Sequence, residues 1–526
     1  MTSEAGGQRR ARDEAPVTIP DMEFRDLIAL RGAPLVRAAS YLSAHPSGRG
    51  ALTRPLLGEM LSQAMQMEEL LDAYGALNNR RWYPFRSLVA AIKQFSRVSY
   101  VLLHIRYGLP AYRLLPIEQD FHLATEQALA FTGDVLLRAA ERLLGQAQWL
   151  HLPMPAGEPG NGPYAEPLAA GQLPSDRAMR KLDNVVETVT HLATAFLNLA
   201  AGSELLHTPG RVSPEEYAAC VPDPVSEEQL RYLQHRFHSL QSVYDTYVFE
   251  TETESLDADL PVLRGHISVI FHLLETATGL AHYYERHVSP RRPRSSARRP
   301  PLISPEALLV TLMDYSLAYA SRYLVCAQNL CRTMLKRYAK IGRIEVPVPR
   351  YRGFHVRPAT LVARVVRHYG SDVQMILDDE PYDARSPIEI FRANERINAR
   401  KRRWLVSEIA RLPLVQNGRS EQDVDTLVRR VVLSLAEQGK VVIYEQPLPL
   451  REEPLANEGT LLEQVIDEIA RLQATGAIDI EAELNIVFIG DERVLGDLEL
   501  LANSGYGEDN FGNNVPLPEQ LAYLRR

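Results

Sequence analysis

Apolar residues recur at helical spacing through most of the first part of the chain. Long runs of this kind cover residues 56–74, 85–107 and 124–150, and short breaks containing glycine or proline separate them. Amphipathic runs joined by short connections predict helices that pack side by side around an apolar core. We therefore expect a helical bundle over residues 21–152.

The helical pattern resumes after a stretch dense in proline and glycine, residues 153–175, which we predict to be a loop. Residues 176–288 continue the bundle. In them, Ser213 and Ser226 each precede a Glu or Gln at the third following position, which is the spacing of a helix-starting capping box. A further long helix is expected at residues 304–340.

Two segments lack the pattern that a folded core requires. Residues 1–20 are polar, and residues 289–303 carry five arginines among serines and prolines. Segments of such low apolar content cannot bury enough surface to fold, so we predict both to be disordered. The basic linker has no aromatic residues interleaved with its arginines, and we do not expect it to bind nucleic acid.

Beyond about residue 341 the pattern changes to short apolar runs of strand type between helices. Strands are predicted at residues 344–348, 372–377 and 382–385, with an acidic turn, Asp-Asp-Glu-Pro, between the last two. Prolines in and beside the first strand suit an edge strand or an irregular one, because proline cannot donate a ladder hydrogen bond. The chain as a whole is therefore expected to be multidomain, with a helical region followed by an α+β domain.

The most informative stretch is residues 353–360, Gly-Phe-His-Val-Arg-Pro-Ala-Thr. It places His355 at the start of an amphipathic helix, with Arg357 and Pro358 just behind it. Proline fits the first helical turn, where no N–H is needed, and the free N–H groups of that turn attract anions. A phosphate on the His355 imidazole would meet these donors, and Arg357 adds a full positive charge beside them.

This octapeptide resembles the active-site segment of HPr, the histidine-containing phosphocarrier protein of the phosphoenolpyruvate:sugar phosphotransferase system, whose pattern is G-[LF]-H-x-R-P-A. The order strand, histidine helix, strand, turn, strand, helix over residues 344–394 is similar to that of the family. The resemblance implies an open-faced β-sandwich, with four strands and helices on one face. It also implies that Nδ1 of His355 is phosphorylated, that Arg357 neutralises the phosphate, that the backbone N–H groups of Val356 and Arg357 hold it, and that Pro358 starts the helix.

After Ser386 the sequence departs from the family pattern. Residues 394–438 predict two further helices, which we interpret as an insertion. The run at residues 441–444 is then expected to be the delayed fourth strand, followed by a closing helix at residues 460–473. The resemblance is therefore close before the insertion and loose over residues 439–473.

The predicted HPr-like domain spans residues 341–475. Residues 476–526 follow it as a C-terminal extension for which the family offers no counterpart. The extension contains an apolar run at residues 485–489, which predicts a strand, and an end rich in glycine and asparagine at residues 505–518.

Three residues that follow the strand predicted at residues 382–385 have candidate roles, which the resemblance implies. Ser386 falls where some members of the family carry a regulatory serine that a kinase phosphorylates. Because Pro387 follows it, Ser386 also fits the N-cap of a helix. Ile388 and Phe391 correspond to positions that present apolar residues to partners in the family, and core packing is an equal alternative for both.

Composition and charge restrict the function classes further. The net charge of −8 is mild for 526 residues. The three cysteines, Cys220, Cys326 and Cys331, form neither a CxxC pair nor an even disulfide framework, which indicates a reducing compartment and therefore the cytoplasm. The N-terminus lacks the apolar core of a signal peptide, and we expect no membrane span. The Glu and His residues of the helices lack the spacing of a bundle metal site, so no metal or other cofactor is expected.

Two functions of different classes fit these features. In the first, His355 accepts a phosphoryl group from an enzyme-I-like donor and passes it to an acceptor protein. The chain is then a carrier with a phosphohistidine intermediate, not a turnover enzyme, and its helical region selects partners or joins copies of the chain. In the second, the protein is a regulator or scaffold whose HPr-like domain binds without carrying phosphate. Intact His355 and Arg357 favour the first function, and the large helical region and the insertion favour the second.

Overall fold

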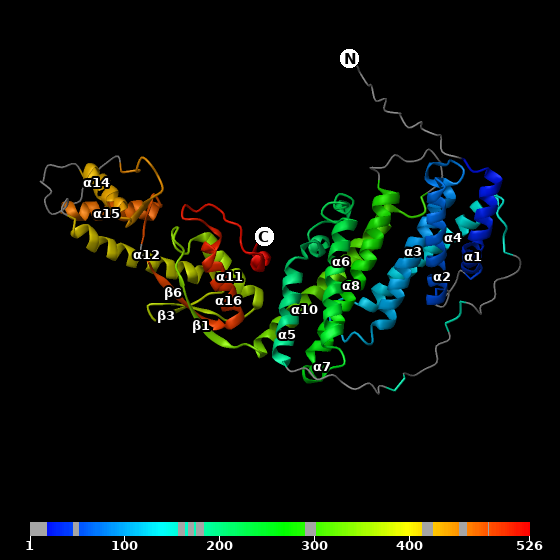
Figure 1. The fold of residues 1–526 in the computed structure, drawn as a ribbon, viewed down its shortest axis with the longest axis horizontal. Helices are drawn as coiled ribbons and strands as arrows, with labels where there is room; N and C mark the ends of the chain where they lie inside the picture. Colours follow the sequence, from blue (N-terminus) through cyan, green and yellow to red (C-terminus); the bar gives the residue numbers. More distant parts are fainter. Residues whose placement is uncertain are drawn as a thin grey trace, which may run out of the picture. The chain divides into compact units, whose positions relative to one another are not determined.

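The computed structural model describes residues 18–45, 52–155, 164–166, 173–174, 184–289, 301–412, 424–451, 460–481 and 483–525. The chain forms two compact units, one of Met1–Lys181 with Ser203–Ala327 and one of Leu182–Gly202 with Gln328–Arg526 (Figure 1). Most of the three segments expected to be disordered or loop-like, residues 1–20, 153–175 and 289–303, lies outside the described residues.

The first unit is a bundle of long helices, as the amphipathic pattern predicts, but Leu182–Gly202, which was expected to continue the bundle, belongs to the second unit. Helix α3 packs against α2, α4 and α8, and α6 packs against α8. The α3 side chains Phe85, Phe95 and Leu102 are fully buried, so this helix supplies the centre of the core. The main helices are α1 (Asp21–Ala44), α2 (Arg54–Ala73), α3 (Tyr83–Gly108), α4 (Phe121–Trp149), α6 (Glu227–Tyr247), α8 (Asp259–Tyr283) and the first part of α10 (Ala318–Arg337).

Shorter elements connect the long helices of the first unit. Ser226 accepts a hydrogen bond from the Gln229 N–H and begins α6, while Ser213 forms its capping box at a short 3-10 turn. The helix predicted at residues 304–340 runs without a break from α9 into α10, with a π-helical stretch between them. These connecting elements are α7 (Glu252–Leu256), α9 (Pro305–Val310), and the π-helical stretches Tyr284–Val288 and Thr311–Leu317.

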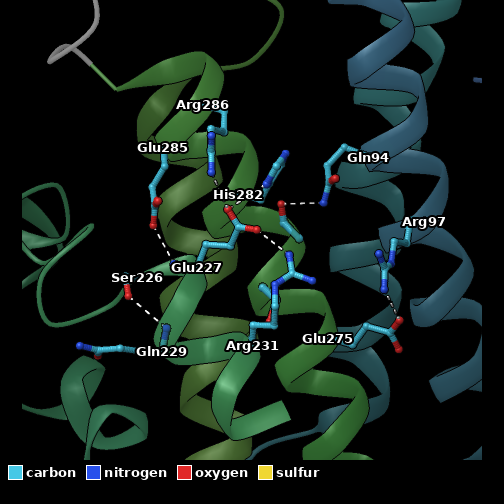
Figure 2. Close-up of polar contacts among 12 residues, drawn as sticks. Gln94, Arg97, Ser226, Glu227, Gln229, Arg231, Glu275, His282, Glu285 and Arg286 are labelled. Carbon is cyan, nitrogen blue, oxygen red and sulfur yellow. Dashed lines mark hydrogen bonds and ion pairs between the residues drawn. The ribbon is translucent and has the colours of Figure 1, made fainter. Parts of the chain in front are cut away.

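An ion network around Glu227 joins α6 to the end of α8 (Figure 2). The carboxylate lies 2.9 Å from Nδ1 of His282 and 3.8 Å from Nη2 of Arg286, and it accepts a hydrogen bond from Arg231. The backbone N–H of Glu227 donates to Glu285. Burial acts to raise the pKa of Glu227, but the contacts with Arg231 and His282 outweigh it and hold that pKa below its ordinary value.

Glu227→Gln should lower the free energy of unfolding of the first unit by about 1–2 kcal/mol at neutral pH, because it removes a charged hydrogen-bond acceptor. A carboxyl group with a lowered pKa in the folded chain stabilises the fold above its unfolded pKa of about 4.3, and this contribution is lost as the pH falls through the folded pKa. The difference in melting temperature between variant and parent should therefore shrink in acid. Exposed Glu228→Gln is the control, and a difference that persists unchanged in acid would contradict the assignment.

The second unit is built on a four-stranded antiparallel sheet with the strand order β1-β6-β2-β3. Strand β1 lies at an edge of this sheet, as its prolines predict. Helix α16 packs against β1 and β6, α12 packs against β3, and α11 contacts both of these helices and α5. The elements are α5 (Val185–Ala201), β1 (Ile341–Pro347), α11 (Val356–Tyr369), β2 (Gln374–Leu377), β3 (Glu380–Asp383), α12 (Pro387–Ala410), β6 (Asn485–Asp491) and α16 (Glu492–Asn503).

The fourth strand of this sheet is not the predicted one. Strand β4 (Val441–Ile443) pairs with β5 (Ile478–Ile480) in a separate two-stranded sheet, so the assignment of residues 441–444 is wrong. Strand β6 pairs with both β1 and β2, although it comes from the extension that was expected to have no counterpart in the HPr family. The helix that follows it and packs on the sheet is α16, and not the predicted α15 (Leu461–Thr475). A strand that lies between two others must form backbone hydrogen bonds along both of its edges. Strand β6 has seven residues for these bonds, whereas β4 has three.

The inserted part has an apolar core of its own. Its first helix is not separate, because α12 continues unbroken for 24 residues from the sheet into the insertion. The insertion also extends past residue 438, since β4, α15 and β5 pack with it, while residues 413–423 lie outside the described chain. Its core joins α12, α14 (Val424–Glu437), α15 and the β4-β5 pair, with buried Leu405, Ile409, Val428, Val431, Ile469 and Ile478.

A buried ion pair fixes α12 to β5 within this inserted part. The Nζ atom of Lys401 lies 3.2 Å and 3.1 Å from the two carboxylate oxygens of Asp479. Their side chains are only 3% and 5% exposed. A pair so well shielded from water needs both partners, because removal of one leaves the other charge buried without compensation.

Lys401→Met should lower the free energy of unfolding of the second unit by about 3–5 kcal/mol, because it leaves the Asp479 carboxylate buried without a cation. The control is Arg400→Met, which removes the neighbouring ion pair with Asp378, whose side chains are each 51% exposed. Exposed pairs contribute at most about 1 kcal/mol. Thermal unfolding of the full chain measures both, and equal losses in the two variants would show that burial of the Lys401 pair does not matter.

Candidate functional site

His355 is the N-cap residue of α11, as the sequence predicts. Its backbone is extended, and its carbonyl accepts the first helical hydrogen bond, from the Ala359 N–H. The His355 side chain does not cap the helix, so the N–H groups of Val356 and Arg357 in the first turn are available to another acceptor. Pro358 is the third residue of the helix, also within the first turn, where it costs no hydrogen bond.

The loop before His355 is held by α12. Gly353 has a left-handed backbone (φ +62°), and a Cβ atom there would lie 2.3 Å from Oδ1 of Asn394. This oxygen accepts a hydrogen bond from the Phe354 N–H at 2.8 Å, and Nδ2 of Asn394 donates to the Arg352 carbonyl at 3.3 Å. Asn394 thus satisfies a donor and an acceptor of the loop, and only glycine fits beside it.

The same loop is tied to the inserted part of the unit. The Arg352 N–H donates to Asp479 at 2.9 Å, and the Arg352 guanidinium donates to the Gly476 carbonyl at 2.6 Å. The Tyr351 ring meets both Tyr444 and His355 edge-on, with ring centroids 4.9 Å and 5.3 Å away. The insertion therefore takes part in positioning the histidine.

A carboxylate from residues 504–525, the C-terminal segment that follows α16, faces His355. Oε2 of Glu508 lies 3.2 Å from Nε2 of His355, and Oε1 lies 3.9 Å from Nε of Arg357. The other ring nitrogen, Nδ1, lies 3.2 Å from the Gly353 carbonyl. The Glu508 side chain is only 7% exposed, and this burial raises its pKa, while the charges of His355 and Arg357 act in the opposite direction.

The segment that carries Glu508 is ordered by tight turns. Gly505 and Gly507 have positive φ, and Glu508 forms a β-bridge with Asn514. A Cβ atom on Gly507 would lie 3.3 Å from Leu361 of α11, so this glycine permits close approach of the segment to the helix. The Gly- and Asn-rich end is therefore part of the candidate site.

An open groove of about 790 Å³ lies along α11 from Val356 onward, between this helix and the C-terminal segment. Arg357, Arg364 and Arg525 line it together with Thr360. The Nε atom of Arg357 is buried and has no hydrogen-bond partner in the described part of the chain. The Glu508 carboxylate faces this nitrogen only at 3.9 Å, beyond hydrogen-bond distance, so a closer acceptor would satisfy the buried donor.

The other predicted residues lie at the start of α12. Ser386 is the N-cap of that helix, where its hydroxyl accepts a hydrogen bond from the Glu389 N–H. Ile388 is 69% exposed, and Phe391 is partly buried. The polar contacts of His355 involve none of these three residues, and their regulatory and docking roles stay predictions.

Comparison of the chain with protein-family models, with curated proteins and with solved structures finds no match. Within the ranges that the structure describes, no group of three or more His, Cys, Asp or Glu side chains is placed to hold a metal ion. None of the helices in those ranges combines the length and the apolar character needed to cross a membrane. The geometry around His355 is therefore the basis for a functional assignment.

Sequence reasoning misses three residues of the site: Glu508, Asn394 and Asp479. Each acts through burial against a segment far away in the chain, which no local pattern indicates. One usable signal is present, since the Gly- and Asn-rich end is followed by the apolar pair Leu521 and Leu524. Such a sequence predicts ordered turns anchored on a core and not a free tail.

Gly353→Ala should destabilise the second unit and displace His355, because the left-handed backbone disfavours a side chain and the new Cβ meets Asn394. Gly439→Ala is a matched control, since Gly439 also has positive φ (+68°) but open space around its Cα. The control should lose about 1–2 kcal/mol of unfolding free energy, and Gly353→Ala should lose more. If the melting temperatures of the two variants fell by the same amount, the Asn394 contact would add no constraint at Gly353.

Proposed function

We propose that the second unit is an HPr-like phosphocarrier in which His355 accepts a phosphoryl group from an enzyme-I-like donor and passes it to an acceptor protein. The observation that carries the proposal is the juxtaposition of His355 with the first turn of α11 and with the Arg357 guanidinium, whose buried Nε has no hydrogen-bond partner in the described chain. Helix N–H groups and a guanidinium are the donors that stabilise a phosphoryl group.

The order of elements around the site also supports the proposal. With the inserted elements α14, β4, α15 and β5 set aside, β1, α11, β2, β3, α12, β6 and α16 run in the order strand, helix, strand, strand, helix, strand, helix. This is the order that the resemblance to HPr implies once β6 and α16 take the places first given to β4 and α15. The insertion lengthens the connection between α12 and β6 without adding a strand to the four-stranded sheet.

A second function, binding without phosphate transfer, is favoured by one specific observation. Both ring nitrogens of His355 lie 3.2 Å from an oxygen, and the side chain is only 25% exposed. A carrier has to present one nitrogen to its donor, so the ring must leave the Gly353 carbonyl or Glu508 before transfer. A regulator or scaffold would have no need for this step.

The carrier proposal predicts an acid-labile, base-stable phosphate on His355. The full chain is incubated with phosphoenolpyruvate and an enzyme I, and separately with phosphoramidate, a small donor that needs no partner protein. Label should appear on the parent and be absent from His355→Ala. Equal labelling of both, or no label on the parent with either donor, would leave the binding function as the better one.

The same assay measures the role of Arg357. Arg357→Lys should slow labelling, and Arg357→Ala should slow it further, because a guanidinium gives a phosphoryl group two parallel N–H bonds and lysine only a point charge. Thermal melting of the lysine variant should change little, since the Arg357 side chain is 37% exposed. A large fall in melting temperature for both variants would mark Arg357 as a structural residue.

A further inference from the structure

The contacts of the two ring nitrogens of His355 differ in kind. Nε2 faces the carboxylate of Glu508, and Nδ1 faces the neutral carbonyl of Gly353. Both oxygens accept hydrogen bonds, so the geometry suits a ring that carries a proton on each nitrogen. A ring in this form has no lone pair for a nucleophilic attack, and one of the two protons must leave first.

The two hydrogen bonds are not equally strong. A bond to a carboxylate is charge-assisted and roughly twice as strong as one to a neutral acceptor. The Glu508 side chain is also 7% exposed, so water competes little for its oxygens. The proton on Nε2 is therefore held more firmly, and the proton on Nδ1 is the one lost to solvent. Nδ1 can then attack once the ring turns away from the Gly353 carbonyl while Nε2 stays with Glu508.

We infer that Glu508 is a positioning residue that keeps the proton of His355 on Nε2 and thereby presents Nδ1 as the atom that accepts a phosphoryl group. This inference rests on the proposed phosphocarrier function. Glu508 touches neither donor nor phosphate in this role and acts through the imidazole. It belongs to the C-terminal segment, for which the resemblance to HPr offers no counterpart.

The transfer step balances with this assignment. The Nδ1 lone pair forms a bond to phosphorus while the bond from phosphorus to the leaving nitrogen of the donor breaks. With phosphoramidate the leaving group departs as ammonia with a proton from solvent, and Nε2 keeps its own proton. The ring gains positive charge as the new bond forms, and the Glu508 carboxylate lies beside it.

The first test reads the tautomer directly and needs no phosphate. The full chain is labelled with ¹⁵N-histidine, and the His355 ring signals are identified by their loss in His355→Ala. In the neutral parent ring the proton should lie on Nε2. In Glu508→Ala the remaining acceptor is the Gly353 carbonyl beside Nδ1, so the proton should move to Nδ1.

Two further variants separate positioning from folding. Glu508→Asp keeps the carboxylate and should keep most of the Nε2–H form, whereas Glu508→Gln keeps the shape and should lose the preference. Exposed Glu519→Gln on the same segment is the matched control and should behave as the parent. The Glu508 inference is wrong if parent and Glu508→Gln show the same tautomer, or if the parent carries its proton on Nδ1.

The second test reads which nitrogen accepts phosphate from phosphoramidate, by ³¹P NMR of the labelled chains. The parent should give the Nδ1 isomer, and Glu508→Ala should shift at least half of the product to Nε2. An unchanged isomer ratio would overturn the inference. A tautomer switch without any phosphohistidine on the parent would overturn the phosphocarrier proposal alone and leave the positioning role of Glu508 in place.

Discussion

Asp479 is the acceptor on which much of the second unit depends. Its carboxylate accepts hydrogen bonds from Nζ of Lys401 on α12 and from the backbone N–H of Arg352 in the loop before His355. Because it is 5% exposed, water cannot take over either contact. The inserted part, the long helix α12 and the histidine loop therefore meet at one buried charge.

This arrangement explains why an insertion can be tolerated so near the candidate site. The loop has two consecutive left-handed residues, Arg352 (φ +54°) and Gly353 (φ +62°), which is a costly backbone for a residue other than glycine. The hydrogen bonds from Arg352 to Asp479 and Gly476 and the bonds of Asn394 compensate for that cost. The insertion supplies part of the support that fixes the direction of the histidine ring.

Local patterns in the sequence predict some features of this molecule well and others not at all. The start of α11 at His355, the N-cap Ser386 and the edge position of β1 follow from the chemistry of proline, of serine and of helix ends, which acts within a few residues. The choice between β4 and β6 as the fourth strand depends on pairing across the sheet. A short apolar run such as residues 441–444 does not contain that information, and neither does the partner of a buried carboxylate such as Glu508.

Strand β6 has a further consequence for the order in which the chain acquires its shape. It follows β1, β2 and β3 in the chain, yet it lies between β1 and β2, so Ile341 cannot meet its partner Asp491 until the whole inserted part has left the ribosome. Until then β1 and the β2-β3 hairpin have open edges of unpaired backbone groups, which are the surfaces through which nascent chains aggregate. Meanwhile the inserted part, with its own core, can form first and hold α12 in place for the strand that arrives last.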